Sequence, residues 1–143
     1  NHGAGDHGRI RAGTKQAFII STAFSAAISA LVFAFARPLM LIFIDASETA
    51  MLLAGIKYLR IEGAFYFGIG CLFLLYGYFR AVQRPAMSVV LTVISLGTRV
   101  ALAYMLSAKI GEIGIWMAIP IGWLLADAVG LLTMFKSRRL QKQ

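Results

Sequence analysis

The sequence predicts an all-α integral membrane protein with four transmembrane helices. Of the 143 residues, 59% are hydrophobic and 14% are charged, whereas a soluble domain typically has about 45–50% apolar and about 25% charged residues. Four apolar runs are each long enough to cross a bilayer, which takes about 20 residues. Basic residues gather in the short segments beside these runs, which is the usual pattern in membrane proteins.

The apolar runs and their joints set the expected organisation. We expect a cytoplasmic loop over residues 1–15, helices over about 16–44, 50–79, 85–107 and 113–135, and a cytoplasmic tail over 136–143. Pro38 falls late in the first run, so that helix should bend or restart there. Asp45 or Ser47 is placed to cap the second helix, and Pro85 suits the first turn of the third. Pro120 predicts a kink in the fourth.

The distribution of Lys and Arg predicts the orientation. Nine basic residues fall on one side of the bilayer and three on the other. The nine are Arg9, Arg11, Lys15, Arg80, Arg84, Lys136, Arg138, Arg139 and Lys142, and the three are Arg37, Lys57 and Lys109. Because positive loops stay inside, we expect both ends in the cytoplasm and a multi-pass protein of the plasma (inner) membrane.

Small residues indicate where helices pack. Ser21, Ser25 and Ser29 recur every fourth residue of the first run, which favours close helix–helix contact in lipid. A substrate-lining polar stripe is the alternative. Gly68 and Gly70 lie in the middle of the second run, where they serve either close packing or a hinge.

Intramembrane charges are costly and usually face the interior of a bundle. Four are expected, at Arg60, Glu62, Arg99 and Asp127. Glu62 and Arg99 fall at similar depth, so an ion pair between them is geometrically possible. Asp127 lies nearer the cytoplasmic end and has no obvious partner at its depth. Structural pairing or an interface anchor is one interpretation, and an ion or substrate pathway through Asp127, Glu62 and Arg99 is the other.

Aromatic residues are concentrated in the second run. Phe65, Tyr66 and Phe67 fall inside the span and either pack against other helices or line a cavity for apolar cations.

Enzyme and metal chemistry find no support in the sequence. The single cysteine, Cys71, can form no intrachain disulfide or cysteine metal site, and both histidines fall in the first seven residues. A literal GxGxxG match at residues 3–8 precedes a membrane span rather than a nucleotide-binding unit. We therefore expect no catalytic residues, no cofactor, no metal site and no nucleic-acid partner.

Several short motifs, in order along the chain, resemble the multidrug and toxic compound extrusion (MATE) family. The opening Asn-x-Gly-Ala-Gly-x-x-x-Arg is similar to that family's cytoplasmic loop after the second helix of a lobe. Later segments are similar to its tenth, eleventh and twelfth helices. The motif positions are Gly3, Gly5, Arg9, Arg80, Pro85 and Trp116.

The resemblance implies a twelve-helix transporter of two lobes, of which this chain would hold the last four helices. Drugs or organic cations would be exported by proton or sodium antiport, with alternating access between the lobes. The expected partners are this substrate, the coupling ion, the lipid bilayer and the missing N-terminal helices. Sodium-coupled members tend to carry a carboxylate in the middle of the tenth helix, where this chain reads Gly68-Ile69-Gly70-Cys71, so the coupling ion stays open.

Other functions also stay open. A lipid or polysaccharide flippase of the same superfamily would need more intramembrane Arg and Lys than Arg60 and Arg99 provide. A small four-helix multidrug transporter acting as a dimer would need a carboxylate in its first span, and residues 16–44 contain none. A membrane scaffold without transport activity is the remaining alternative.

Overall fold

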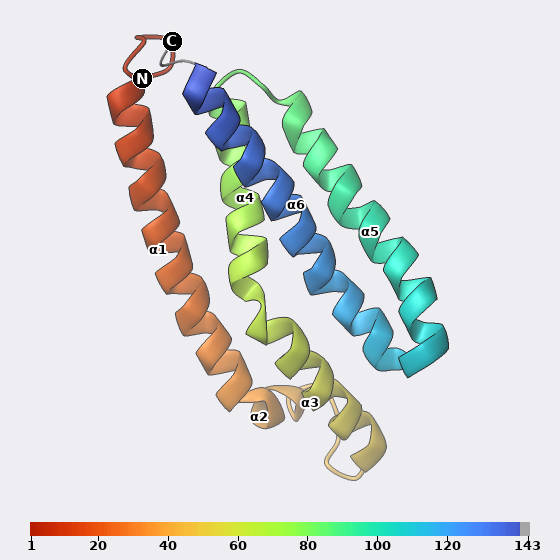
Figure 1. Ribbon diagram of the computed structural model, residues 1–143. Coiled ribbons are helices and arrows are strands. Elements are labelled where there is room, and N and C mark those ends of the chain that lie inside the picture. Colours follow the sequence, from red (N-terminus) through yellow and green to blue (C-terminus); the bar gives the residue numbers. More distant parts are fainter. Residues whose placement is uncertain (141–143) are drawn as a thin grey trace.

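The fold was analysed in a computed structural model that describes residues 1–140. The regular elements in this part of the chain are all helices, joined by short turns (Figure 1). The helices are α1 (His7–Ala34), α2 (Ala36–Met40), α3 (Thr49–Ala64), α4 (Tyr66–Ala81), α5 (Ala86–Ile110) and α6 (Glu112–Leu140).

Three helices, α1, α5 and α6, are each long and apolar enough to cross a membrane. Helices α3 and α4 pass the same test only together, and the 48° bend between them fits either a broken span or a re-entrant loop. The predicted all-α membrane bundle is therefore confirmed. Figure 1 places the start of the chain, the end of α6 and the α4–α5 link at one end of the bundle, with α2 and the α5–α6 turn at the other.

Helix α1 begins earlier than the sequence predicted. Residues 7–15 were expected to belong to a loop, but they form the first turns of α1. The Asp6 side chain accepts a hydrogen bond of 2.9 Å from the Arg9 backbone N–H, and this cap satisfies a donor that the helix itself leaves unpaired. The apolar run marked only the lipid-facing part of a longer helix, and α6 likewise extends beyond the expected limit at residue 135.

The break near Pro38 is confirmed. Helix α1 ends at Ala34, and the short α2 begins at Ala36 with Pro38 in its first turn. Proline has no N–H, and its ring clashes with the carbonyl four residues earlier, which here belongs to Ala34. The chain therefore restarts as a new helix instead of continuing α1.

The predicted cap of the second span is wrong. The Asp45 carboxylate accepts hydrogen bonds from the Ser47 backbone N–H at 2.9 Å and from the Ser47 hydroxyl at 2.7 Å. These bonds hold the pKa of the exposed Asp45 below its usual value. Both side chains are thus engaged with each other, and Glu48 stands at the N-cap of α3 without a side-chain hydrogen bond.

The second span breaks at Phe65, ahead of its two mid-span glycines. Gly70 serves close packing, whereas a Cβ at Gly68 would make only ordinary contacts. A Cβ at Gly70 would lie 2.6 Å from Ser25 Oγ on α1, and one at Gly68 would lie 3.5 Å from Trp123 on α6. The contact predicted for the serine row is confirmed, since Ser25 is the buried residue of α1.

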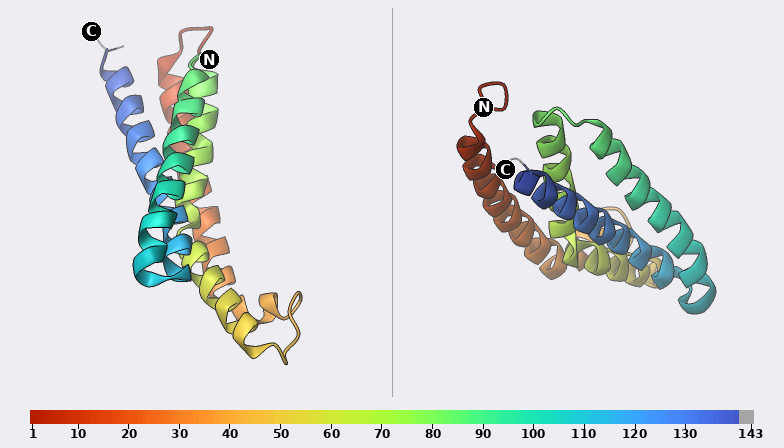
Figure 2. Two further views of the ribbon diagram at one scale, coloured as in Figure 1. Left: turned by 90° about the vertical axis from the view of Figure 1, so that its right-hand side faces the viewer. Right: turned by 45° about the horizontal axis from the view of Figure 1, so that its top comes forward.

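Helices α5 and α6 form a tight antiparallel hairpin (Figure 2). Gly111 closes it at φ +63°, a conformation that favours glycine. Pro85 immediately precedes α5, close to its predicted place in the first turn, and α6 continues through Pro120 without ending.

The core joins α4, α5 and α6 through Leu72, Leu75, Phe79, Leu91, Trp123, Ala126 and Met134.

Candidate functional site

Asp127 lies in the contact between α6 and α4, with only 6% of its surface exposed. Its carboxylate shares a side-chain hydrogen bond with the thiol of Cys71. The second oxygen, Oδ1, has no hydrogen-bond partner among the described residues. No cation pairs with Asp127 among the described residues, and α4 brings the Cys71 thiol to one of its oxygens.

Glu62 and Arg99 lie close enough to interact electrostatically. They form no direct ion pair, however: the one salt bridge among the described residues joins Arg9 and Asp6. Glu62 is 4% exposed, and its Oε1 and the Nε of Arg99 are buried without hydrogen-bond partners in the described part of the chain. The fold therefore brings two opposite charges near each other, while one polar atom of each side chain lacks a hydrogen bond.

Both intramembrane arginines lie over aromatic rings. The Arg99 guanidinium carbon is 5.9 Å from the centre of the Trp123 ring, and that of Arg60 is 5.3 Å from the Phe33 ring. Cation–π contacts of this kind stabilise a cation where water is scarce. Trp123 precedes Asp127 by one turn of α6, so Arg99 of α5 lies over a ring one turn away from Asp127.

The three aromatic residues at the break take different directions. Tyr66 lines a groove between α1 and α4, whereas Phe65 packs against the core. Phe67 is exposed, and its ring centre lies 6.3 Å from that of Phe65. Only Tyr66 of the three borders the groove, and a cavity-lining role for the other two stays a proposal.

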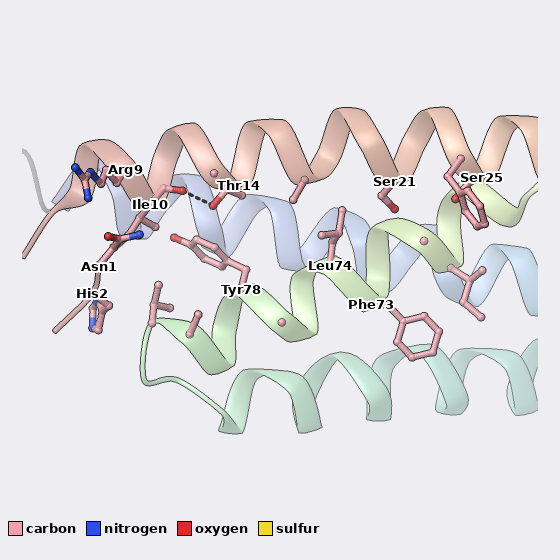
Figure 3. Close-up of a pocket in the computed structure, with 18 of the residues that line it drawn as sticks. Asn1, His2, Arg9, Ile10, Thr14, Ser21, Ser25, Phe73, Leu74 and Tyr78 are labelled. Atoms are coloured by element: carbon pink, nitrogen blue, oxygen red, sulfur yellow. Dashed lines mark hydrogen bonds between the residues drawn. The ribbon is translucent and has the colours of Figure 1, made fainter. Parts of the chain in front are cut away.

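The groove between α1 and α4 has a volume of about 910 Å³. Figure 3 shows it running between the two helices, with Ser21 and Ser25 at one end and Asn1, His2 and Arg9 at the other. Asp127, Glu62 and Arg99 do not line it. The groove and the buried charges are therefore separate features of the bundle.

The remaining motif positions make local contacts in this chain. Gly5 adopts φ +69° in the turn before α1, and Arg9 forms its ion pair with Asp6 at 3.4 Å. Arg80 lies in the last turn of α4, where a cation suits the helix dipole. The Trp116 ring meets that of Tyr58 edge-on at 5.9 Å. Gly3 lies in the same turn as Gly5, with open space around it.

Sequence reasoning missed two residues that lie beside the buried charges. Cys71 and Trp123 both contact the buried charges, yet each reads alone as an ordinary apolar residue of a span. Their importance follows from the packing of α4 and α5 against α6, which no spacing within one helix reveals. No group of three or more His, Cys, Asp and Glu side chains in the described residues could hold a metal ion.

A bundle of apolar helices with buried charges defines a multi-pass membrane protein. The MatE family model matches residues 1–105, most of the chain, and the chain belongs to this family. No curated protein and no solved structure matches it. MATE proteins are transporters of small molecules rather than enzymes, and this function applies to the chain in that general sense.

Proposed function

We propose that this chain forms part of a cation-coupled antiporter that exports organic cations or drugs by alternating access. The coupling ion is a proton or sodium. In such transporters the central site lies between repeats, so the missing N-terminal helices of the same protein are the partner that completes it.

The observation that carries the proposal is the buried Asp127 with its unpartnered Oδ1. A carboxylate inside a membrane bundle is costly and marks an ion or proton pathway. Gly68 and Cys71 lie in the first turns of α4, directly after the break at Phe65. Asp127 of α6 lies beside these two residues. Broken membrane helices commonly border ion sites. These features favour Asp127 as the group that exchanges the coupling ion.

The alternatives are less well supported. A flippase for phosphate-bearing lipids would use basic side chains to hold the phosphate, but Arg60 and Arg99 lie over Phe33 and Trp123 instead. A small dimeric transporter would need a carboxylate in its first span, and α1 contains none.

We also propose that the end of the bundle holding the start of the chain and the end of α6 is cytoplasmic. The nine-to-three distribution of Lys and Arg supports this orientation.

The test is export of a cationic dye by the full-length protein carrying Asp127→Asn. We expect ion-driven efflux to be lost while the amount of protein in the membrane stays near normal. Glu112→Gln is the matched control, because Glu112 is an exposed carboxylate in the first turn of α6. Wild-type efflux by Asp127→Asn would refute the role of this residue.

A further inference from the structure

The groove between α1 and α4 narrows at one end and opens at the other. At Gly70 the helices touch, because a Cβ there would lie 2.6 Å from Ser25 Oγ. At Gly77, two turns further along α4, a Cβ would meet nothing within 4 Å. The two helices therefore separate toward the end that carries Arg9 and His2, and leave the space of about 910 Å³ between them (Figure 3).

The walls of the groove suit hydrocarbon. Side chains such as Ile10, Phe24 and Leu74 line it. The Thr14 hydroxyl, which also faces it, donates to the Ile10 carbonyl at 2.6 Å and is already satisfied. From Thr14 to Ser25 the groove runs about 16 Å along α1, close to one leaflet of a core about 30 Å thick. An acyl chain of one leaflet would match this length.

The mouth of the groove is basic. Arg9 lines it, and its side chain is 77% exposed despite the contact with Asp6. Arg11 and Lys15 follow within the next two turns of α1 but do not line the groove. The Nδ1 atom of His2, which also lines the mouth, has no hydrogen-bond partner in the described residues. This mouth would repel an organic cation and attract an anionic group.

We propose that the groove binds an anionic phospholipid, with an acyl chain between α1 and α4 and the phosphate at Arg9. Basic pockets between membrane helices on the cytoplasmic side bind anionic headgroups, and the proposed orientation places Arg9 on that side. The lipid site is separate from Asp127 and does not depend on its role in ion coupling.

The test uses the full-length protein extracted from bilayers of phosphatidylglycerol and phosphatidylcholine, with retained lipid measured by native mass spectrometry. Wild type should retain phosphatidylglycerol in preference. Arg9→Gln should weaken this retention about fivefold, the effect of one basic residue near the headgroups. The capping bond survives this change, because it uses the Arg9 backbone N–H. Arg11→Gln removes the same charge from a residue that does not line the groove and should retain the lipid.

A second pair of variants tests the acyl chain. Gly77→Leu should fill the open groove and abolish retention, whereas Gly97→Leu, at an equally open site on α5, should not. Equal thermal unfolding of the two variants would show that Gly77→Leu is folded. Unchanged retention in Gly77→Leu would mean that another part of the protein fills the groove, and the proposal would be wrong. Equal retention of both lipids by wild type, or displacement of the lipid by tetraphenylphosphonium, would also overturn it.

Discussion

The thiol of Cys71 on α4 shares a hydrogen bond with the carboxylate of Asp127 on α6. Gly68, one turn earlier on α4, also lies beside the carboxylate: a Cβ there would be in ordinary contact with Asp127 Oδ2, at 3.8 Å. Of the charged groups on the helices packed against α6, Arg99 lies over the Trp123 ring and interacts with the nearby Glu62. Cys71 is therefore the side chain placed to influence Asp127 directly.

Cys71→Ala should change how transport depends on the coupling ion. A hydrogen bond to a charged group contributes about 1.5–3 kcal/mol, so we expect the ion concentration for half-maximal efflux to move by about tenfold or more. Cys71→Ser keeps a donor of similar size and should behave nearly as wild type. The measurement is efflux rate against ion concentration. If the alanine variant matches wild type, the hydrogen bond has no part in coupling.

Glu62→Gln and Arg99→Met should each lower the free energy of unfolding by about 3 kcal/mol or more. Each substitution removes one charge and leaves the remaining buried charge without its counter-charge. The double variant should lose less than the two single losses together, since the charges then disappear as a pair. Thermal unfolding of the four proteins measures this coupling. Strictly additive losses would show that the two residues act independently.

Gly122→Ala should destabilise the α5–α6 hairpin. A Cβ at Gly122 would lie 2.6 Å from the Ser95 backbone oxygen, and backbone cannot move aside as a flexible side chain can. Overpacking of this kind costs about 1–3 kcal/mol. Gly97→Ala is the control, because its Cβ meets nothing within 4 Å. Equal unfolding temperatures for the two variants would contradict this packing.

Reporters fused to the chain should find both ends in the cytoplasm. Tags active only in that compartment, placed at the loop before α1 and after Gln143, should both give signal. A third tag in the link between α2 and α3 should be silent. Signal from that link together with silence at Gln143 would reverse the proposed orientation.

Much of the fold could be predicted because a helix that crosses lipid must be apolar along its length. Long apolar runs mark the spans. Pro38 interrupts the helix through its missing N–H and its ring, whatever packs around it. The start of α1 was harder to predict, since Asp6 caps a helix whose first turns are polar. The break at Phe65 was also missed. Gly63 packs against Val32 of α1 and Gly68 against α6, so tertiary packing and not local propensity decides where the span bends.

The candidate site could be predicted only in part. The cost of intramembrane charge singled out Glu62, Arg99 and Asp127 in the sequence, and all three prove partly or fully buried. Which of them meet was beyond sequence reasoning, because helix rotation and depth set the partners. The expected Glu62–Arg99 pair is near but not direct, and Asp127 finds its partner in Cys71 instead.

The central claim is that Asp127 couples ion movement to export. It is tested most directly with the full-length protein in proteoliposomes, where efflux of a cationic dye is followed under an imposed proton or sodium gradient. We predict that Asp127→Asn loses gradient-driven efflux but still lets the dye move down its own gradient, because only ion exchange is removed. Gradient-driven efflux at the wild-type rate in Asp127→Asn would contradict the claim.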